Sequence, residues 1–533
     1  MNWEKLLSEK RIRKSDPKDI RNPFESDYGR IIYSPALRRM HDKTQVFPLT
    51  TDDNIHSRLT HSNEVMSLGY TFGIKLCKSE LIQKKTKKTE LELMRVMPIL
   101  LQSVCLIHDI GNAPFGHFAE TIISEYFRNL EKSKKNSFRK LNGHQKRDFL
   151  FYDGNAQGLR VLIKLQYLND IFGLNLTCAT LASYMKYPNY EQINDKKGIM
   201  PIEKNKHGVF YSEKDFFESI IEECGLNIKG KILRHPLCYL MEAADSIAYL
   251  CMDMEDGFNK GLLDIECIKE VFRENKSKIA TSILAICDKK FDDPNTKIVH
   301  MRITLISYLV DLAYINFEKN LDLIEVGKYN TELIEENNDI LKELKHFSQK
   351  KIFTAREINY LESTGHSVIK GLLDFYIEFS FHENKKFVRK AEALISRSII
   401  QCAIEECIID IGNRKFKTQL NEKNTAIKKF KGESEFLRQL QKEKSDIESR
   451  FSDFNTLEKI YTTLFSKQLQ KALTISEKET LLETKDKIRK IVEPCYNDLD
   501  NYYKFRVILD FISGMTDQYA LNHYQKISGQ KIN

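Results

Sequence analysis

The sequence predicts an all-α fold, and three observations carry that prediction. Glycine and proline number only 22 and 11 in 533 residues, so turn signals are few and a many-stranded β fold is disfavoured. Several stretches place apolar residues at helical spacing, most clearly "CYLMEAADSIAYLCMDMEDGF" at 238–258. A composition of 41% hydrophobic and 30% charged residues is typical of a globular protein with a substantial core.

In chain order, the sequence divides into three parts. Residues 1–55 are polar and irregular but rich in aromatic side chains that need burial, so we expect an ordered segment wrapped on the body. Residues 56–265 hold the strongest helical patterns and form the main domain. Residues 266–533 are a C-terminal helical region whose apolar end packs on the body. Within it, 413–450 is strongly charged and predicts an exposed helical hairpin or a flexible insertion.

The main domain yields five expected elements. Helical patterning begins near Ser57, and the lysine-rich segment 83–90 is typical of a solvated loop. An apolar helix over 91–108 follows, and a further helix begins near Asn155. Residues 184–215 are rich in Tyr, Pro, Gly, Lys and Asn and predict a long loop, which inside a domain is usually functional or disordered.

The net charge and the cysteine pattern limit which partners and which cellular compartment we expect. A formal net charge of +8 over this length permits contact with phosphates without requiring it. The eleven cysteines form no C-x-x-C pair, and "MNWEKLLSEKRIRKSD" is no secretory leader, so we expect a cytoplasmic protein. The longest apolar run, 96–107, is short and interrupted by Pro98, so we expect no membrane contact.

Ionizable side chains interrupt the apolar helices at four places. Burying a charge is costly unless a partner is present, so each place needs one. Any one of these groups, considered alone, could be a structural ion pair or a buried core residue. Taken together, ionizable faces on three apolar helices favour a metal ion as the missing partner. The four groups are Arg58 with His61; the adjacent His108 and Asp109; His117 with Glu120; and Asp245, Tyr249 and Asp253 at four-residue spacing.

The residue types restrict the metal. Imidazole and carboxylate together suit a divalent ion of borderline hardness such as iron, manganese, cobalt or nickel, whereas zinc would more often recruit cysteine. Gly111 supports a helix end at His108-Asp109, where both adjacent side chains can face one point. His61 and Asp245, arriving from other helices, would complete a two-histidine, two-aspartate set with open positions for water or a substrate oxygen.

These motifs resemble a known family. "HSRLTHSNEV", "HDIGNAPFGHFAE" and "EAADSIAYL" match the H…HD…D pattern of the HD-domain metal-dependent phosphohydrolases. "RIIYSPALRRMHDKTQVFPL", "DGNAQGLRVL", "FTAREINYLESTGHSVIKGLLD" and "FISGMTDQYALNHY" are similar to blocks of the deoxyguanosine triphosphate triphosphohydrolases (dGTPases), of the longer bacterial branch. The resemblance covers the chain apart from 413–450. It implies an HD-domain helical core with additional helices on its N- and C-terminal sides.

The resemblance also implies roles for individual residues. His117 would be the catalytic residue near the α-phosphate, assisted by Glu120. The metal ligands would be His61, His108, Asp109 and Asp245. The substrate-binding residues would be Gln45, Val46, Tyr249 and Asp253 at the sugar, Arg58, Lys186, Lys206 and, more weakly, Arg302 at the triphosphate, and Asn155 at the start of its helix.

The activity that the resemblance implies is metal-dependent hydrolysis of dGTP to deoxyguanosine and triphosphate, by water attack at the α-phosphate, with magnesium or manganese on the phosphate tail. Members of this family assemble as homo-oligomers, often hexamers, and bind single-stranded DNA. Two enzyme alternatives stay open: a broader, dNTP-regulated dNTP triphosphohydrolase, and another HD phosphohydrolase acting on monophosphates or an alarmone. A nucleic-acid-binding protein without enzyme activity, using the basic segments 83–90, 131–147 and 413–431, is disfavoured because the sequence keeps the full set of metal ligands.

Overall fold

The structure, a computed structural model, is helical throughout the residues that it describes, and the predicted all-α class is confirmed. Within these residues the sheet is a single antiparallel hairpin, in which β1 (Asn227–Ile228) pairs with β2 (Lys231–Ile232). The described residues are 1–13, 19–50, 52, 54–133, 136–166, 172–191, 206–273, 275, 277–291, 293–336, 339–407, 442 and 495–530.

The helices follow one another through short connections. Residues 397–407 are also helical, and η3 is π-helical. The other bounds are α1 Trp3–Leu6, α2 Pro23–Ile32, α3 Pro35–Arg39, η1 Met40–Asp42, α4 Arg58–Lys78, α5 Glu80–Thr86, α6 Glu90–Met94, α7 Met97–Ile107, α8 His117–Lys132, η2 Ser137–Lys140, α9 Gly143–Leu150, α10 Gly154–Arg160, η3 Val161–Leu165, α11 Cys178–Tyr184, η5 Tyr211–Glu213, α12 Lys214–Glu223, α13 Pro236–Asn259, α14 Ile265–Arg273, α15 Lys278–Asp288, α16 Pro294–Glu325, α17 Asp339–Lys351, α18 Arg356–Ser380, α19 Lys385–Leu394, η6 Tyr496–Asp498, α24 Asn501–Ser513 and α25 Asp517–Ile527.

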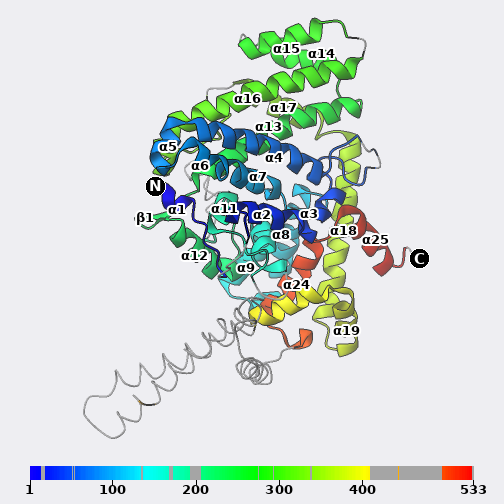
Figure 1. The fold of residues 1–533 in the computed structure, drawn as a ribbon. Coiled ribbons are helices and arrows are strands. Elements are labelled where there is room, and N and C mark those ends of the chain that lie inside the picture. Colours follow the sequence, from blue (N-terminus) through cyan, green and yellow to red (C-terminus); the bar gives the residue numbers. More distant parts are fainter. Residues whose placement is uncertain are drawn as a thin grey trace.

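Two large hydrophobic clusters make up most of the core. The first joins α2, α4, α7, α11, α13 and α16, with α13 packed between α4 and α16 (Figure 1). The second joins α8, α9, α18, α24 and α25, on the side where the C-terminal helices gather (Figure 1). The turn after α7 passes from one cluster to the other, since Ile110 belongs to the first and Phe115 to the second. This turn therefore lies where the two hydrophobic clusters meet.

Glycines let α4 and α7 approach closely. A Cβ on Gly69 would lie 2.5 Å from Cys105 Sγ, and one on Gly73 would lie 2.4 Å from Pro98 Cα. No side chain fits at either contact, because real Cβ atoms do not approach that near. The close packing of these two helices holds the start of α4 next to the end of α7.

The structure modifies two of the predicted elements. The helix expected over 91–108 is divided into α6 and α7 by a break at residues 95–96, because Pro98 fits the first turn of a helix and not its interior. The loop expected at 83–90 is shorter, since 83–86 continue α5 until Lys87 ends it in a left-handed conformation. The charged segment 413–450 lies outside the described residues, apart from Lys442.

The N-terminal segment is ordered where the structure describes it. Trp3 and Phe24 are buried, and the Asp27 carboxylate accepts a hydrogen bond from Arg11 at 2.5 Å and from the Thr177 hydroxyl at 2.7 Å. Among the described helices, α16 is long and apolar enough to cross a membrane by length and composition alone. It packs along α13, as a helix of a soluble bundle also would, so the expected lack of membrane contact stays a prediction.

Candidate functional site

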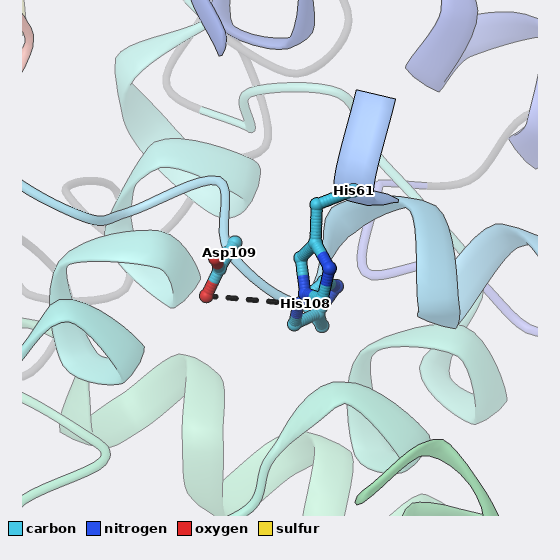
Figure 2. A group of neighbouring side chains, drawn as sticks. All are labelled: His61, His108 and Asp109. Atoms are coloured by element: carbon cyan, nitrogen blue, oxygen red, sulfur yellow. Dashed lines mark ion pairs between the residues drawn. The ribbon is translucent and has the colours of Figure 1, made fainter. Parts of the chain in front are cut away.

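The four predicted metal ligands, hereafter the metal group, come together from three helices. Donor atoms of His61 on α4 and of His108 and Asp109 after α7 all lie within 4.8 Å of one another (Figure 2). Asp245 of α13 adds Oδ1, which lies 3.2 Å from His61 Nε2 and 3.3 Å from His108 Nε2. Two imidazoles and two carboxylates therefore converge on one point.

The orientation of His108 fits a metal ligand. Its Nδ1–H donates to the Cys105 carbonyl at 2.7 Å, so Nε2 is the ring nitrogen that faces the other three side chains. Nε2 is buried and lies 3.3 Å from Asp245 Oδ1 and 3.7 Å from Asp109 Oδ1, and in the absence of a metal these two carboxylates raise the pKa of His108 to about 9. The His61 and His108 rings meet edge to face, with centroids 5.2 Å apart. A buried imidazole nitrogen that faces two carboxylates fits a divalent cation of borderline hardness.

Both carboxylates of the metal group stay ionised. Burial alone would raise the pKa of Asp109, but Arg58 and His108 outweigh burial and hold it at about 2. For Asp245 burial acts in the same direction, and the charge and hydrogen bond of His108 hold its pKa well below the usual value. Arg58 is buried and pairs with Asp109 Oδ2, so this arginine stands beside the metal group.

His117 lies at the exposed edge of the site, at the start of α8. Its Nδ1 is 3.4 Å from Glu120 Oε2, and its side chain is 71% exposed. The Glu120 carboxylate is largely buried, and its Oε1 accepts a hydrogen bond from the Gly154 N–H at 3.0 Å. The hydrogen bond to Glu120 raises the pKa of His117, so the imidazole tends to keep its proton. Glu120 thus orients His117 through Nδ1 and favours its protonated form.

Lys186 and Lys206 both lie near the ring of Tyr187. Lys186 pairs with Glu242 at 3.0 Å and Lys206 with Asp153 at 3.0 Å. Their Nζ atoms lie 5.8 and 5.9 Å from the Tyr187 ring centroid. Burial would lower the pKa of each lysine, but the paired carboxylate outweighs it and raises the pKa. Both lysines therefore stay charged.

The predicted sugar side contains two unpaired acceptors. Asp253 Oδ2 and Gln45 Oε1 are buried and lack hydrogen-bond partners. Tyr249 lies on the same stripe of α13 as Asp245 and Asp253, and its ring stacks on Phe353 with centroids 6.2 Å apart and planes 7° apart. Val46 belongs to the small hydrophobic cluster that Phe353 also contacts.

Two predicted substrate residues are engaged elsewhere. Arg302 pairs with Glu255, ten residues beyond Asp245 on α13, or about 15 Å along the helix axis. The structure does not bring Arg302 to the metal group. The amide of Asn155 donates to Asp153 Oδ1 at 2.8 Å, so it supports the N-terminus of α10.

Known proteins match this chain over most of its length. A deoxyguanosinetriphosphate triphosphohydrolase-like protein of Listeria innocua is 34% identical over 399 residues, covering 71% of this chain and 84% of the relative. One of Synechocystis is 34% identical over 392 residues, covering 71% and 86%. The chain belongs to the deoxyguanosinetriphosphate triphosphohydrolase family. Its similarity to the Yersinia enterocolitica deoxyguanosinetriphosphate triphosphohydrolase is 26% over 556 residues, covering 96% and 95%.

A second match concerns the C-terminal region of this family member. The family described as the phosphohydrolase-associated domain matches residues 476–526, of which 495–526 are described. This stretch contains α24 and the start of α25, which pack in the second hydrophobic cluster. The predicted membership of the dGTPase family, with its HD-type phosphohydrolase character, is confirmed.

Residue patterns alone missed three contributors to this dGTPase-family site. Phe353 supports Tyr249, Lys43 donates to the Asn112 carbonyl, and Asp517 accepts from the Phe115 N–H. Each lies in one of the sequence blocks that carry the family resemblance. The blocks therefore pointed to these residues, but their roles could not be predicted because the contacts join segments far apart in the sequence.

A large cavity in the described part of the chain is separate from this site. It has a volume of about 920 Å³, and its walls include Arg21, Arg30, Arg39, Tyr33 and Tyr519. None of the predicted catalytic, metal-binding or substrate-binding residues lines it. Cavity size alone therefore would not have located the metal group.

Proposed function

We propose that this protein hydrolyses dGTP to deoxyguanosine and triphosphate, with a divalent metal ion at the metal group. The observation that carries the proposal is the group of donor atoms of His61, His108 and Asp109 within 4.8 Å of one another, with Asp245 Oδ1 beside both imidazoles. The names of the relatives support a deoxynucleoside triphosphate as the substrate.

Metal and proton donor have separate roles in this proposal. Magnesium or manganese, with iron, cobalt or nickel as alternatives, would offset charge at the α-phosphate and lower the pKa of the attacking water. His117 would donate a proton to the leaving 5′-oxygen through Nε2, because Glu120 holds Nδ1. Lys186 and Lys206, both charged, would bind the triphosphate together with Arg58.

The sugar side supports a preference for deoxynucleotides. Asp253 Oδ2 and Gln45 Oε1 are acceptors that a 3′-hydroxyl could satisfy. Tyr249, held flat against Phe353, would occupy the space that a 2′-hydroxyl needs. None of these residues addresses the base, so the same site also fits a broader dNTP triphosphohydrolase, with or without regulation by one dNTP. A homo-oligomer such as a hexamer, single-stranded DNA as effector and a cytoplasmic location stay predictions.

A substrate panel tests the proposal. The purified protein would be incubated with each of the four dNTPs and with GTP in the presence of Mn²⁺, and the products separated by chromatography. We expect deoxyguanosine and triphosphate from dGTP, and little product from GTP. Equal turnover of all four dNTPs would favour the broader enzyme. Deoxynucleoside monophosphate and pyrophosphate as the products would refute the assigned bond cleavage.

A further inference from the structure

Asp517, at the start of α25, contacts two segments far away in the sequence. Its Oδ2 accepts a hydrogen bond from the Thr44 N–H at 3.0 Å and another from the Thr44 hydroxyl. Its Oδ1 accepts a hydrogen bond from the Phe115 N–H at 2.9 Å. The side chain is buried, with 2% of the residue exposed. One carboxylate therefore joins the segment before Gln45 to the turn before His117.

The carboxylate is not needed to cap its own helix. Thr516 is the N-cap of α25, and its side chain accepts from the Tyr519 N–H. An aspartate in the first helical turn ordinarily gains from the helix dipole alone. Asp517 instead satisfies three donors outside its helix. Its contacts serve the segments that it joins.

The turn that Asp517 holds has an unfavourable backbone. Phe115 has a φ of 66°, which is costly for a residue with a side chain, and Gly116 follows at 69°. The Phe115 ring packs so closely on α18 that a Cβ at Gly365 would lie 2.8 Å from Phe115 Cγ. These two conformations reverse the chain between Asp109 and His117. A restraint on Phe115 N–H therefore restrains where His117 emerges.

Lys43 holds the other side of the same turn. Its buried Nζ donates to the carbonyl of Asn112 and, at 2.9 Å, to the carbonyl of Ser513, the last residue of α24. Its own carbonyl accepts from the Arg58 N–H at 2.8 Å. The end of α24 and the start of α25 thus hold the turn from both sides.

We infer that Asp517 is a positioning residue of the hydrolytic site, fixing the turn that presents His117 and the segment that presents Gln45. The inference rests on the proposed function, because it acts through His117. It also gives the phosphohydrolase-associated region a definite role, since the C-terminal helices would set the geometry of a site whose side chains lie hundreds of residues earlier.

The test compares Asp517→Asn with Thr516→Ala. Asparagine keeps the size of the side chain but turns an NH₂ toward one of the donors that the carboxylate accepts from. We expect kcat/KM for dGTP to fall about 10- to 100-fold, since small misplacements of catalytic groups cost that much. Metal content should not change. Thr516→Ala removes the helix cap but leaves the hydrogen bonds to Thr44 and Phe115. It should lower the melting temperature about as much as Asp517→Asn does, but should lower kcat/KM less than about threefold.

A double variant separates positioning from stability. Glu120→Gln loosens His117 by a different route, so Asp517→Asn should add less than about threefold to the loss of kcat in that background. The inference would be overturned if the losses of kcat from Glu120→Gln and Asp517→Asn multiplied fully in the double variant. It would also be overturned if Asp517→Asn and Thr516→Ala lost kcat/KM equally. Normal turnover by His117→Ala would instead overturn the proposed function, so the two failures are distinguishable.

Discussion

His117 and Asp245 serve the proposed site differently, so their removal should have different consequences. His117 is exposed and contacts Glu120, whereas Asp245 lies between the imidazoles of His61 and His108. His117 is assigned proton transfer and Asp245 is assigned metal binding. Metal content and turnover therefore separate the two roles.

Removing His117 should abolish chemistry without releasing metal. We expect His117→Ala to keep its metal by elemental analysis and to lose about 10²- to 10⁴-fold in kcat, the usual contribution of a general acid. His41→Ala is the matched control, since His41 is exposed and pairs only with its neighbour Asp42. Unchanged turnover in His117→Ala would remove His117 from the mechanism.

Removing Asp245 should release the metal. We expect Asp245→Ala to contain little metal after dialysis, because one of four ligands is gone and two imidazoles lose their anionic neighbour. Asp253→Asn, eight residues along the same stripe of α13, should keep its metal and lose substrate affinity. A full metal complement in Asp245→Ala would contradict its place in the metal group.

The start of α10 packs tightly against the turn between Asp109 and His117 and against Glu120. A Cβ on Gly154 would lie 2.2 Å from Asn112 Oδ1 and 2.7 Å from Glu120 Oε1. Asn112 in turn donates to Asp109 Oδ1 at 2.7 Å. A single methyl group at this position should therefore disturb both the metal group and the proton donor.

Gly154→Ala should reduce both stability and activity. We expect a loss of about 1–3 kcal/mol in the free energy of unfolding, typical of overpacking, and a fall of at least tenfold in kcat/KM. Gly143→Ala is a close control, because Gly143 also begins a helix and a Cβ there meets nothing within 4 Å. If both variants behaved alike, the close contact at α10 would be unimportant.

The start of α13 should make folding sensitive to acid. His235, fully buried, caps this helix by accepting the Leu237 N–H at Nδ1, and its Nε2–H donates to the Leu6 carbonyl. Burial lowers the pKa of His235 to about 4, from 6.5. Only the unfolded chain binds a proton between these values, so stability is full above pH 6.5 and falls as the pH drops toward 4. The pKa difference corresponds to at most about 3 kcal/mol.

Urea unfolding at pH 7.5 and 5 measures this effect. His235→Asn keeps a side-chain oxygen that can cap Leu237 but removes the titrating group, so its stability should depend less on pH over this interval. Parallel pH dependence in the two proteins would show that His235 does not contribute.

Across the whole molecule, the sequence predicted what depends on local spacing. The helical class and the starts of α4 and α10 followed from periodicity and capping residues, because these signals lie within one turn of the helix. The start of α7 did not, since Pro98 was counted inside an apolar run. Segments 192–205 and 413–441 lie outside the described residues, so the predictions made for them stand untested.

Long-range contacts could not be predicted from spacing. His61 and Asp245 are 184 residues apart, and Phe115 and Asp517 are 402 apart. The family resemblance supplied the first pair, because both belong to one motif set. It supplied no role for Asp517, and Arg302 shows the opposite case, a proposed phosphate ligand that pairs with Glu255. Which of these residues contact one another depends on how the helices pack, and spacing along the sequence does not determine that packing.

Hydrolysis of dGTP in ¹⁸O-labelled water with Mn²⁺ tests the central claim most directly. Water attack at the α-phosphorus breaks the bond between phosphorus and the 5′-oxygen, so the label must enter the triphosphate. The account predicts unlabelled deoxyguanosine and singly labelled triphosphate from the unmodified protein, and formation of both products at least about 100-fold more slowly from His117→Ala. Labelled deoxyguanosine, or dGMP with pyrophosphate, would contradict it.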